Sequence, residues 1–198
     1  MLLAVTCPVC ETRGRAPCPR CAAELRPAPI LPAPPGVDEC LTLLSYEGAG
    51  RELVARLKYR NHRAALPGLA AAMASLVVDP GAAGVVTWAP TTPQRRRQRG
   101  FDQAELLARA VARCLGRPCR RLLVRRPGPP QTGASRAERR HAPVLDPRRG
   151  VPHPAVLVVD DVVTTGATMA AAARALRRAG AGHVVALAAA RTPGPGLH

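Results

Sequence analysis

The stretch 155–159, which ends in Val-Leu-Val-Val, is the feature that most constrains the fold. Consecutive apolar residues of this kind, followed at once by two acidic residues, predict a strand that is buried on both faces. A turn is expected at 160–166, a helix at 167–179 with Gly180 as its stop, and another strand at 183–189. Two strands joined by a helix lie parallel, so the pattern predicts an α/β fold with a mostly parallel central sheet flanked by helices.

Further elements of the same domain precede this unit. Their order along the chain supports one α/β domain over residues 38–198. Asp102 has the side chain and the position of an N-cap for the helix that follows it. Strands are expected at 41–46, 84–88 and 120–124, and helices at 50–59, 64–78 and 102–115.

Two neighbouring carboxylates, Asp160 and Asp161, stand where the buried strand is expected to end. Ligands of open parallel sheets collect at the carboxyl ends of strands, where the next helix offers unpaired N–H groups. Carboxylates suit the hydroxyls of a ribose or a Mg²⁺ ion with its waters, whereas hydroxyls and a tight glycine turn suit a phosphate. The group that follows the acids consists of Thr164, Thr165, Gly166 and Thr168. This order predicts a site for a ribose 5-phosphate group.

The two commonest phosphate-binding motifs are missing from the sequence. Neither the Gly-x-x-x-x-Gly-Lys-Ser/Thr of a P-loop nor the Gly-x-Gly-x-x-Gly of a dinucleotide fold is present. The alternative to a ligand site is a plain turn and helix cap, because Thr and Asp are ordinary capping residues. The acids, threonines and glycine occur together directly after a buried strand, and this combination favours the ligand site.

The run 156–168 resembles the binding motif for phosphoribosyl pyrophosphate (PRPP) in type I phosphoribosyltransferases: four apolar residues, two acids, then Thr-Thr-Gly-x-Thr. In that family the acids contact the ribose, and the loop binds the 5-phosphate of PRPP with Mg²⁺. The resemblance implies a type I phosphoribosyltransferase-like fold and a set of PRPP-binding residues. They are Asp160, Asp161, Thr164, Thr165, Gly166, Ala167 and Thr168.

Nearly the whole chain also resembles the ComF family of competence-associated proteins. The shared features, in chain order, are a cysteine zinc module, Leu57-Lys58-Tyr59, a strand that ends near Pro90, the block Arg99–Ala104, a loop with Gln131-Thr132-Gly133 and Arg136–Arg140, and the PRPP motif. This resemblance implies a role in DNA uptake, with single-stranded DNA or DNA-uptake and recombination proteins as partners.

Two positions depart from the ComF pattern. Asp102 stands where the family has Asn, and 141–145 stands where an Asn and a later Gly-x-Phe are expected. The second departure bears on the closure of the loop and hence on turnover.

Four of the seven cysteines form the pattern Cys-x₂-Cys-x₇-Cys-x₂-Cys within residues 1–25. The pairs Cys7–Cys10 and Cys18–Cys21 can complete a tetrahedral thiolate site, for which zinc is the expected ion; reduced or redox-active pairs are the alternative. Residues 1–25 hold too little apolar mass to fold unaided, so a structural Zn²⁺ is expected to supply the folding energy. Small buried apolar roles are expected for Cys40, Cys114 and Cys119.

Arginine accounts for all but one of the 29 basic residues, and the formal net charge is +16. Such a charge indicates a polyanion partner or simply reflects codon composition. The segment 95–100 should lie at the same edge of the sheet as the acids, so Arg95 and Arg99 are expected to contact pyrophosphate oxygens. A solvated positive face or general nucleic-acid contact is the alternative interpretation.

Three other segments complete the organisation. Residues 26–37 form a Pro-rich linker that is expected to be extended and semi-rigid. The length and composition of the segment 125–149 predict either a mobile hood over the site or a disordered loop. The N-terminus lacks the features of a signal peptide, and no apolar run has the length of a membrane span, so a cytoplasmic protein is expected.

Three classes of function remain open at this stage. The first is a phosphoribosyltransferase, a pentosyl transfer enzyme, that acts on an unidentified nitrogenous acceptor. The second is a non-catalytic PRPP-fold accessory protein that binds single-stranded DNA or a DNA-processing partner. The third is a PRPP-sensing regulator without turnover. No side chain in the sequence stands out as a general base, so binding residues are expected and no catalytic residue is assigned.

Overall fold

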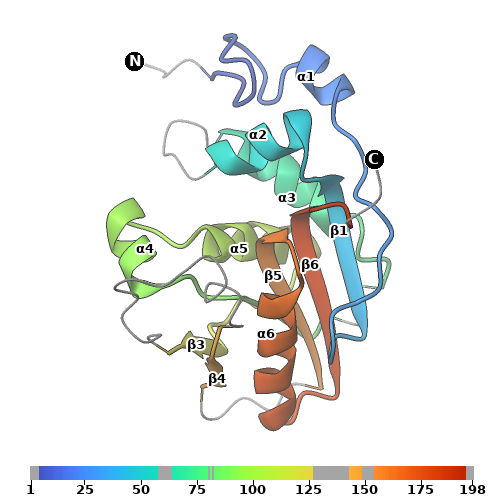
Figure 1. Ribbon diagram of the computed structural model, residues 1–198, viewed down its shortest axis with the longest axis vertical. Coiled ribbons are helices and arrows are strands. Elements are labelled where there is room, and N and C mark those ends of the chain that lie inside the picture. Colours follow the sequence, from blue (N-terminus) through green and yellow to red (C-terminus); the bar gives the residue numbers. More distant parts are fainter. Residues whose placement is uncertain are drawn as a thin grey trace.

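A four-stranded parallel sheet forms the centre of the molecule, with strand order β1-β6-β5-β2 (Figure 1). The computed structural model describes residues 5–57, 64–79, 81, 83–126, 143–148 and 154–194. The predicted α/β fold with a mostly parallel central sheet is confirmed. The strands are β1 Glu39–Ser45, β2 Val85–Trp88, β5 Ala155–Val163 and β6 His183–Arg191.

Helices cover both faces of the sheet (Figure 1). Helix α6 packs on one face, while α2, α3 and α5 pack on the other. The bounds are α2 Gly48–Arg56, α3 Leu66–Ala74, α5 Gln103–Leu115 and α6 Ala167–Arg178.

Strand β5 explains why the sheet needs cover on both sides. Val156 and Val158 belong to the apolar cluster with α6, whereas Leu157 and Val159 belong to the cluster with α5. Each of these four side chains is at most 1% exposed. Because successive side chains of a strand point to opposite faces, a continuous apolar run is stable only between two layers of helices.

An antiparallel pair of short strands lies beside the main sheet: β3 Leu123–Arg125 and β4 Leu145–Pro147. Arg178 of α6 holds β4 in place, since it donates to the Leu145 carbonyl at 3.1 Å and lies 3.7 Å from the Asp146 carboxylate. Most of the predicted loop 125–149 lies outside the described residues, as do Lys58 and Tyr59.

The Pro-rich linker contacts the domain at several points along its length. The Ala28 N–H donates to the Leu43 carbonyl at 3.1 Å, and the Ser45 N–H donates to the Arg26 carbonyl at 2.9 Å. The linker therefore runs antiparallel to the end of β1, where it covers the edge of the sheet (Figure 1). It then crosses to α6 before it enters β1 at Glu39.

Two expectations from the sequence were wrong. The turn predicted at 160–166 begins later, because β5 continues to Val163 and remains paired with β6, where Val163 lies opposite Arg191. The acid pair therefore lies within the last residues of a strand. Cys114 was expected to be buried, but it is exposed near the end of α5, and Cys40 and Cys119 are only half-buried.

A helix that the sequence did not predict, α4, covers Pro93–Arg99. Its N-cap Thr92 accepts a hydrogen bond from the Arg95 N–H at 3.2 Å, and Gly100 ends it in the left-handed conformation at φ 75°. These two caps place the arginine-rich segment on a helix of fixed direction beside the start of α5.

Candidate functional site

A cavity of about 280 Å³ opens at the carboxyl ends of the strands. Contributions come from the ends of β1, β2 and β5, from α4, from the starts of α5 and α6, and from β3. The lining side chains include three carboxylates and three guanidinium groups. The lining consists of Tyr46, Ala89, Pro90, Thr91, Arg95, Arg99, Asp102, Gln103, Ala104, Arg125, Asp160, Asp161, Val162, Thr164 and Thr168.

The acid pair forms the wall of the cavity that β5 supplies. Asp160 accepts a hydrogen bond from the Asp161 N–H at 2.8 Å, and Asp161 accepts one from the Val162 N–H at 2.9 Å. These bonds fix both carboxylates against the end of the strand. Burial, and then the neighbouring charge of Asp161, raise the pKa of Asp160 well above its ordinary value. A bound cation or a set of hydroxyl donors would relieve this repulsion.

The threonine loop forms the adjoining wall. Gly166 has φ 76° and ψ −1°, a left-handed conformation that favours glycine, and α6 begins at the next residue. Thr164 and Thr168 line the cavity, while Thr165 accepts a hydrogen bond from the Ala167 N–H at 3.4 Å. The first turn of α6 contains no acidic residue, so the positive end of its dipole faces this loop unopposed.

Three arginines also line the cavity. Arg95 and Arg99 come from α4 and lie at the edge of the sheet that the sequence predicted for them. Arg125 comes from β3. Burial, and then the charge of Arg95, lower the pKa of Arg125. Guanidinium groups that line one cavity favour an anion between them.

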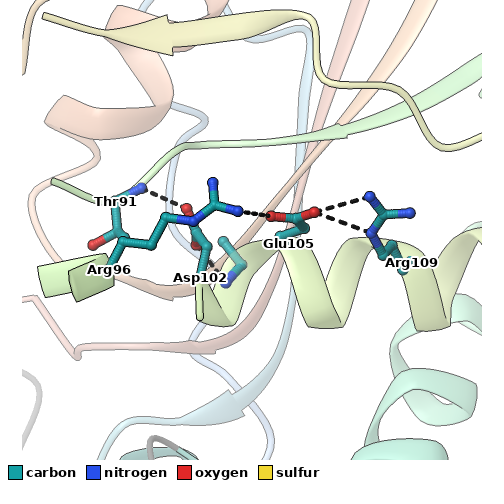
Figure 2. Close-up of polar contacts among 6 residues, drawn as sticks. Thr91, Arg96, Asp102, Glu105 and Arg109 are labelled. Atoms are coloured by element: carbon teal, nitrogen blue, oxygen red, sulfur yellow. Dashed lines mark hydrogen bonds and ion pairs between the residues drawn. The ribbon is translucent and has the colours of Figure 1, made fainter. Parts of the chain in front are cut away.

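Asp102 lines the cavity and lies at the start of α5, next to Thr91 (Figure 2). It is 4% exposed, and its pKa is raised by that burial. Its role as N-cap of α5 was predicted, and the Ala104 N–H donates to it at 3.1 Å. Next to it, Glu105 forms ion pairs with Arg96 at 3.6 Å and Arg109 at 2.9 Å, so Arg96 is directed along α5 (Figure 2).

Nine lining residues were not predicted as site residues, and the polar ones among them are Tyr46, Thr91, Asp102, Gln103 and Arg125. Tyr46 directly follows β1, and the carboxyl end of β1 lies at the same edge of the sheet as the acid pair. The predicted strand at 41–46 was therefore a signal in the sequence for this residue. Gln103 donates to the Val54 carbonyl at 3.2 Å, which ties the cavity to α2. That contact joins residues far apart in the chain, and it carries no local signal.

The four N-terminal cysteines converge, as their spacing predicted. The sulfur atoms of Cys7, Cys10, Cys18 and Cys21 all lie within 4.8 Å of one another. Cys10 Sγ and Cys18 Sγ are 3.7 Å apart, close to the distance of about 3.8 Å that a tetrahedral site with Zn–S bonds of about 2.3 Å requires. The donor set and its size therefore fit a zinc ion.

The chain around the cysteines supports a metal site. The Cys18 N–H donates to Cys7 Sγ at 3.4 Å, an interaction that favours a thiolate. Hydrogen bonds with Thr12 lower the pKa of Cys10 to about 6, whereas burial raises the pKa of Cys21 to about 12, and Arg20 provides a neighbouring cation. Glu11 pairs with Arg56 of α2, so this module contacts the main domain.

The fold and cavity define an open α/β sheet with a polar site at the carboxyl ends of its strands. Within it, residues 103–194 match the family model of the phosphoribosyl transferase domain. The matched segment contains both the acid pair and the threonine loop. Membership of the ComF family stays a prediction.

The chain is similar to a solved structure of the allosteric regulatory enzyme of purine biosynthesis, with 24% sequence identity and a TM-score of 0.47. The similarity covers 68% of this chain and 30% of that chain, so this chain spans less than a third of the other. Curated proteins gave no match.

None of the helices in the described part of the chain has the length and the apolar character needed to cross a bilayer.

Proposed function

We propose that the cavity binds PRPP, or another ribose 5-phosphate ligand, together with Mg²⁺. The observation that carries the proposal is the lining of one cavity, which brings the acid pair and two threonines together with three arginines. A sugar with two separate anionic groups needs both kinds of surface. The match of residues 103–194 to the phosphoribosyl transferase domain supports the same ligand.

Each part of PRPP finds a complementary group. Asp160 and Asp161 accept hydrogen bonds from the ribose hydroxyls, and the threonine loop with the start of α6 binds the 5-phosphate. Arg95, Arg99 and Arg125 bind the pyrophosphate. Magnesium, when bound, supplies charge neutralisation for the pyrophosphate, and the acid pair is the group that would hold it with its waters.

A transfer reaction at this site breaks the bond between ribose C1 and a pyrophosphate oxygen and forms a bond from C1 to a nitrogen of the acceptor. Pyrophosphate leaves with the electron pair of the broken bond, and the acceptor loses a proton to solvent. The arginines stabilise the charge that develops on the leaving group, and no covalent protein nucleophile is needed. We propose a nitrogenous acceptor of this kind, and a ComF-like role in a competence pathway.

A second candidate is an accessory role in DNA processing without turnover. Its support is the surface of α4, on which Arg96 and Arg97 are exposed, together with the net charge of +16. Such a surface attracts the phosphates of single-stranded DNA. A third candidate, a PRPP-sensing regulator, uses the same cavity.

Calorimetric titration of PRPP with Mg²⁺ tests the proposed ligand. We expect wild-type protein to bind and the double variant Asp160→Asn, Asp161→Asn to show no measurable affinity. Asp79→Asn, an exposed acid outside the cavity, is the matched control and should bind like wild type. Unchanged affinity in the double variant would defeat the assignment.

Two further assays separate the three candidates. Pyrophosphate release from PRPP in the presence of nitrogenous acceptors selects the transferase. A steep dependence of single-stranded DNA affinity on salt, without release, favours the accessory role. PRPP binding that alters a partner interaction without turnover indicates the regulator.

A further inference from the structure

The Pro-rich linker packs directly behind the threonine loop. Pro34 is buried, and a β-carbon built on Gly166 would lie only 2.7 Å from Pro34 Cγ and 3.0 Å from Pro34 Cβ. The proline ring therefore contacts the loop backbone at the residue that turns the chain into α6. No side chain fits between the two residues.

Arg191 holds the linker in this position. It lies at the end of β6, opposite Val163, and is only 7% exposed. Its guanidinium donates to the carbonyls of Leu31 at 3.2 Å and Pro32 at 2.8 Å. A buried guanidinium is costly, and in the described part of the chain its Nε–H has no partner. The two hydrogen bonds to the linker carbonyls therefore offset part of the cost of burying Arg191, and they hold the linker in place.

A turn fixes the linker beyond Pro34. The Val37 N–H donates to the Pro34 carbonyl at 3.1 Å, and Gly36 takes φ 82° close to Ala173 of α6. Asp38 then accepts from the Val184 N–H at 2.7 Å. Anchors on both sides of Pro34 clamp its ring against the loop.

The loop is also held from the side of β6. The Thr192 N–H donates to the Val163 carbonyl at 3.0 Å, and its hydroxyl lies 3.3 Å from the Thr164 carbonyl. The residue after Arg191 thus contacts the residues just before Gly166. One short segment of chain, 191–192, supports both the loop and the linker.

We propose that Arg191 and Pro34 are positioning residues for the 5-phosphate of the ligand. Neither residue lines the cavity, so both act through the backbone of the threonine loop. Arg191 fixes the linker, the linker presses Pro34 against Gly166, and this contact sets the turn that presents the threonine hydroxyls and the first amides of α6. The inference rests on the proposed function, because it requires that this loop binds a phosphate.

The test compares two probes that use different parts of the cavity: ribose 5-phosphate, which needs the loop, and inorganic pyrophosphate, which needs the arginines. Both are titrated with Mg²⁺ into wild type, Pro34→Ala, Arg191→Met and Arg191→Lys. We expect Pro34→Ala to weaken ribose 5-phosphate binding about tenfold, Arg191→Met to weaken it further, and Arg191→Lys to recover part of the loss. Pyrophosphate affinity should stay within about twofold of wild type.

Pro29→Ala provides the matched control, because it makes the same change in the same linker at a residue that takes part in none of these contacts. It should bind both probes like wild type. Arg191→Met removes a buried side chain and can prevent folding, so circular dichroism and the melting temperature are measured for every variant. Pro34→Ala is the milder change, because it removes only the two outer ring carbons. Pro34→Ala keeps the test informative if Arg191→Met does not fold.

Three outcomes overturn the inference. Unchanged ribose 5-phosphate affinity in Pro34→Ala, with wild type binding, overturns the positioning role and leaves the proposed ligand in place. Equal losses for both probes indicate general destabilisation. A wild-type protein that binds neither probe overturns the proposed function, and this inference with it.

Discussion

Thr91 donates its backbone N–H to one carboxylate oxygen of Asp102 at 2.9 Å, while the Ala104 N–H donates to the other oxygen at 3.1 Å (Figure 2). One buried side chain thus caps α5 and holds the segment that leaves β2. That segment leads directly into α4, which carries two arginines of the cavity. The cap of one helix therefore helps to fix the position of another.

Replacement of Asp102 should lower the free energy of unfolding through the loss of its two hydrogen bonds. Asp102→Ala removes a helix cap and leaves two buried N–H groups without an acceptor, so the free energy of unfolding should fall by about 2 kcal/mol. Asp102→Asn keeps the cap through its amide oxygen but turns a donor toward Thr91, and should lose about 1 kcal/mol. Urea unfolding measures both. No loss in Asp102→Asn would show that the bond to Thr91 contributes nothing, and equal losses in the two variants would show the same of the cap bond to Ala104.

The sequence predicted the parallel sheet well, because the signal is local: the run 156–159 has a composition that only a doubly covered strand tolerates. The end of β5 was misplaced because Val162 and Val163 follow the acids and keep the pairing with β6. The position of Arg95 at the edge of the sheet that holds the acid pair followed from its place directly after the strand that ends near Pro90. The burial of Arg125 depends on a pairing with a distant segment, which no local pattern carries.

The repulsion between Asp160 and Asp161 should make stability depend on pH. Burial and the neighbouring acid raise the pKa of Asp160, so the folded protein holds this proton to higher pH than the unfolded chain does. The associated stability is present below the ordinary value of 3.8 and is lost as the pH rises through the folded pKa. Asp161→Asn should relieve the repulsion and stabilise the protein, without added Mg²⁺, by about 1 kcal/mol at pH 7.

The same variant should show little difference from wild type near pH 4, where Asp160 of the folded wild type is still protonated. Urea unfolding at both pH values measures the effect. Asp79→Asn, which changes an exposed acid, is the control and should change stability by less than about 0.5 kcal/mol. A parallel displacement of the wild-type and Asp161→Asn curves at both pH values would contradict the repulsion.

The contact between Gly166 and Pro34 predicts an unusually costly glycine substitution. Gly166→Ala combines a left-handed backbone with a β-carbon 2.7 Å from Pro34 Cγ, so it should destabilise the protein by about 3 kcal/mol. Gly116→Ala is the matched control: it has φ 64° at the end of α5, and a β-carbon there meets nothing within 4 Å. It should cost only about 1 kcal/mol. Similar costs for the two variants in thermal unfolding would contradict the predicted clash.

Arg125 should contribute to anion affinity although it lies far in sequence from the other site residues. Arg125→Ala removes a half-buried cation from the cavity, and pyrophosphate affinity with Mg²⁺ should fall about tenfold, as expected for one charge-assisted contact. Arg121→Ala, an exposed arginine that precedes β3 and does not line the cavity, is the control. Calorimetry gives both affinities, and a loss of equal size in the control would indicate a long-range charge effect.

Removal of metal should separate the stability of the cysteine module from that of the main domain. The four sulfurs lie close enough together to bind one thiophilic ion. Among the module's cysteines only Cys7 and Cys21 are buried, so a bound metal is expected to hold the module together. Chelation should make the chain before residue 26 sensitive to protease, whereas fluorescence of the buried Trp88 should stay unchanged. Cys18→Ser should behave like chelated protein, and Cys114→Ser, at an exposed cysteine outside the cluster, should behave like wild type. Equal resistance of the module before and after chelation would mean that its contacts with the domain, such as Glu11 with Arg56, suffice to keep it folded.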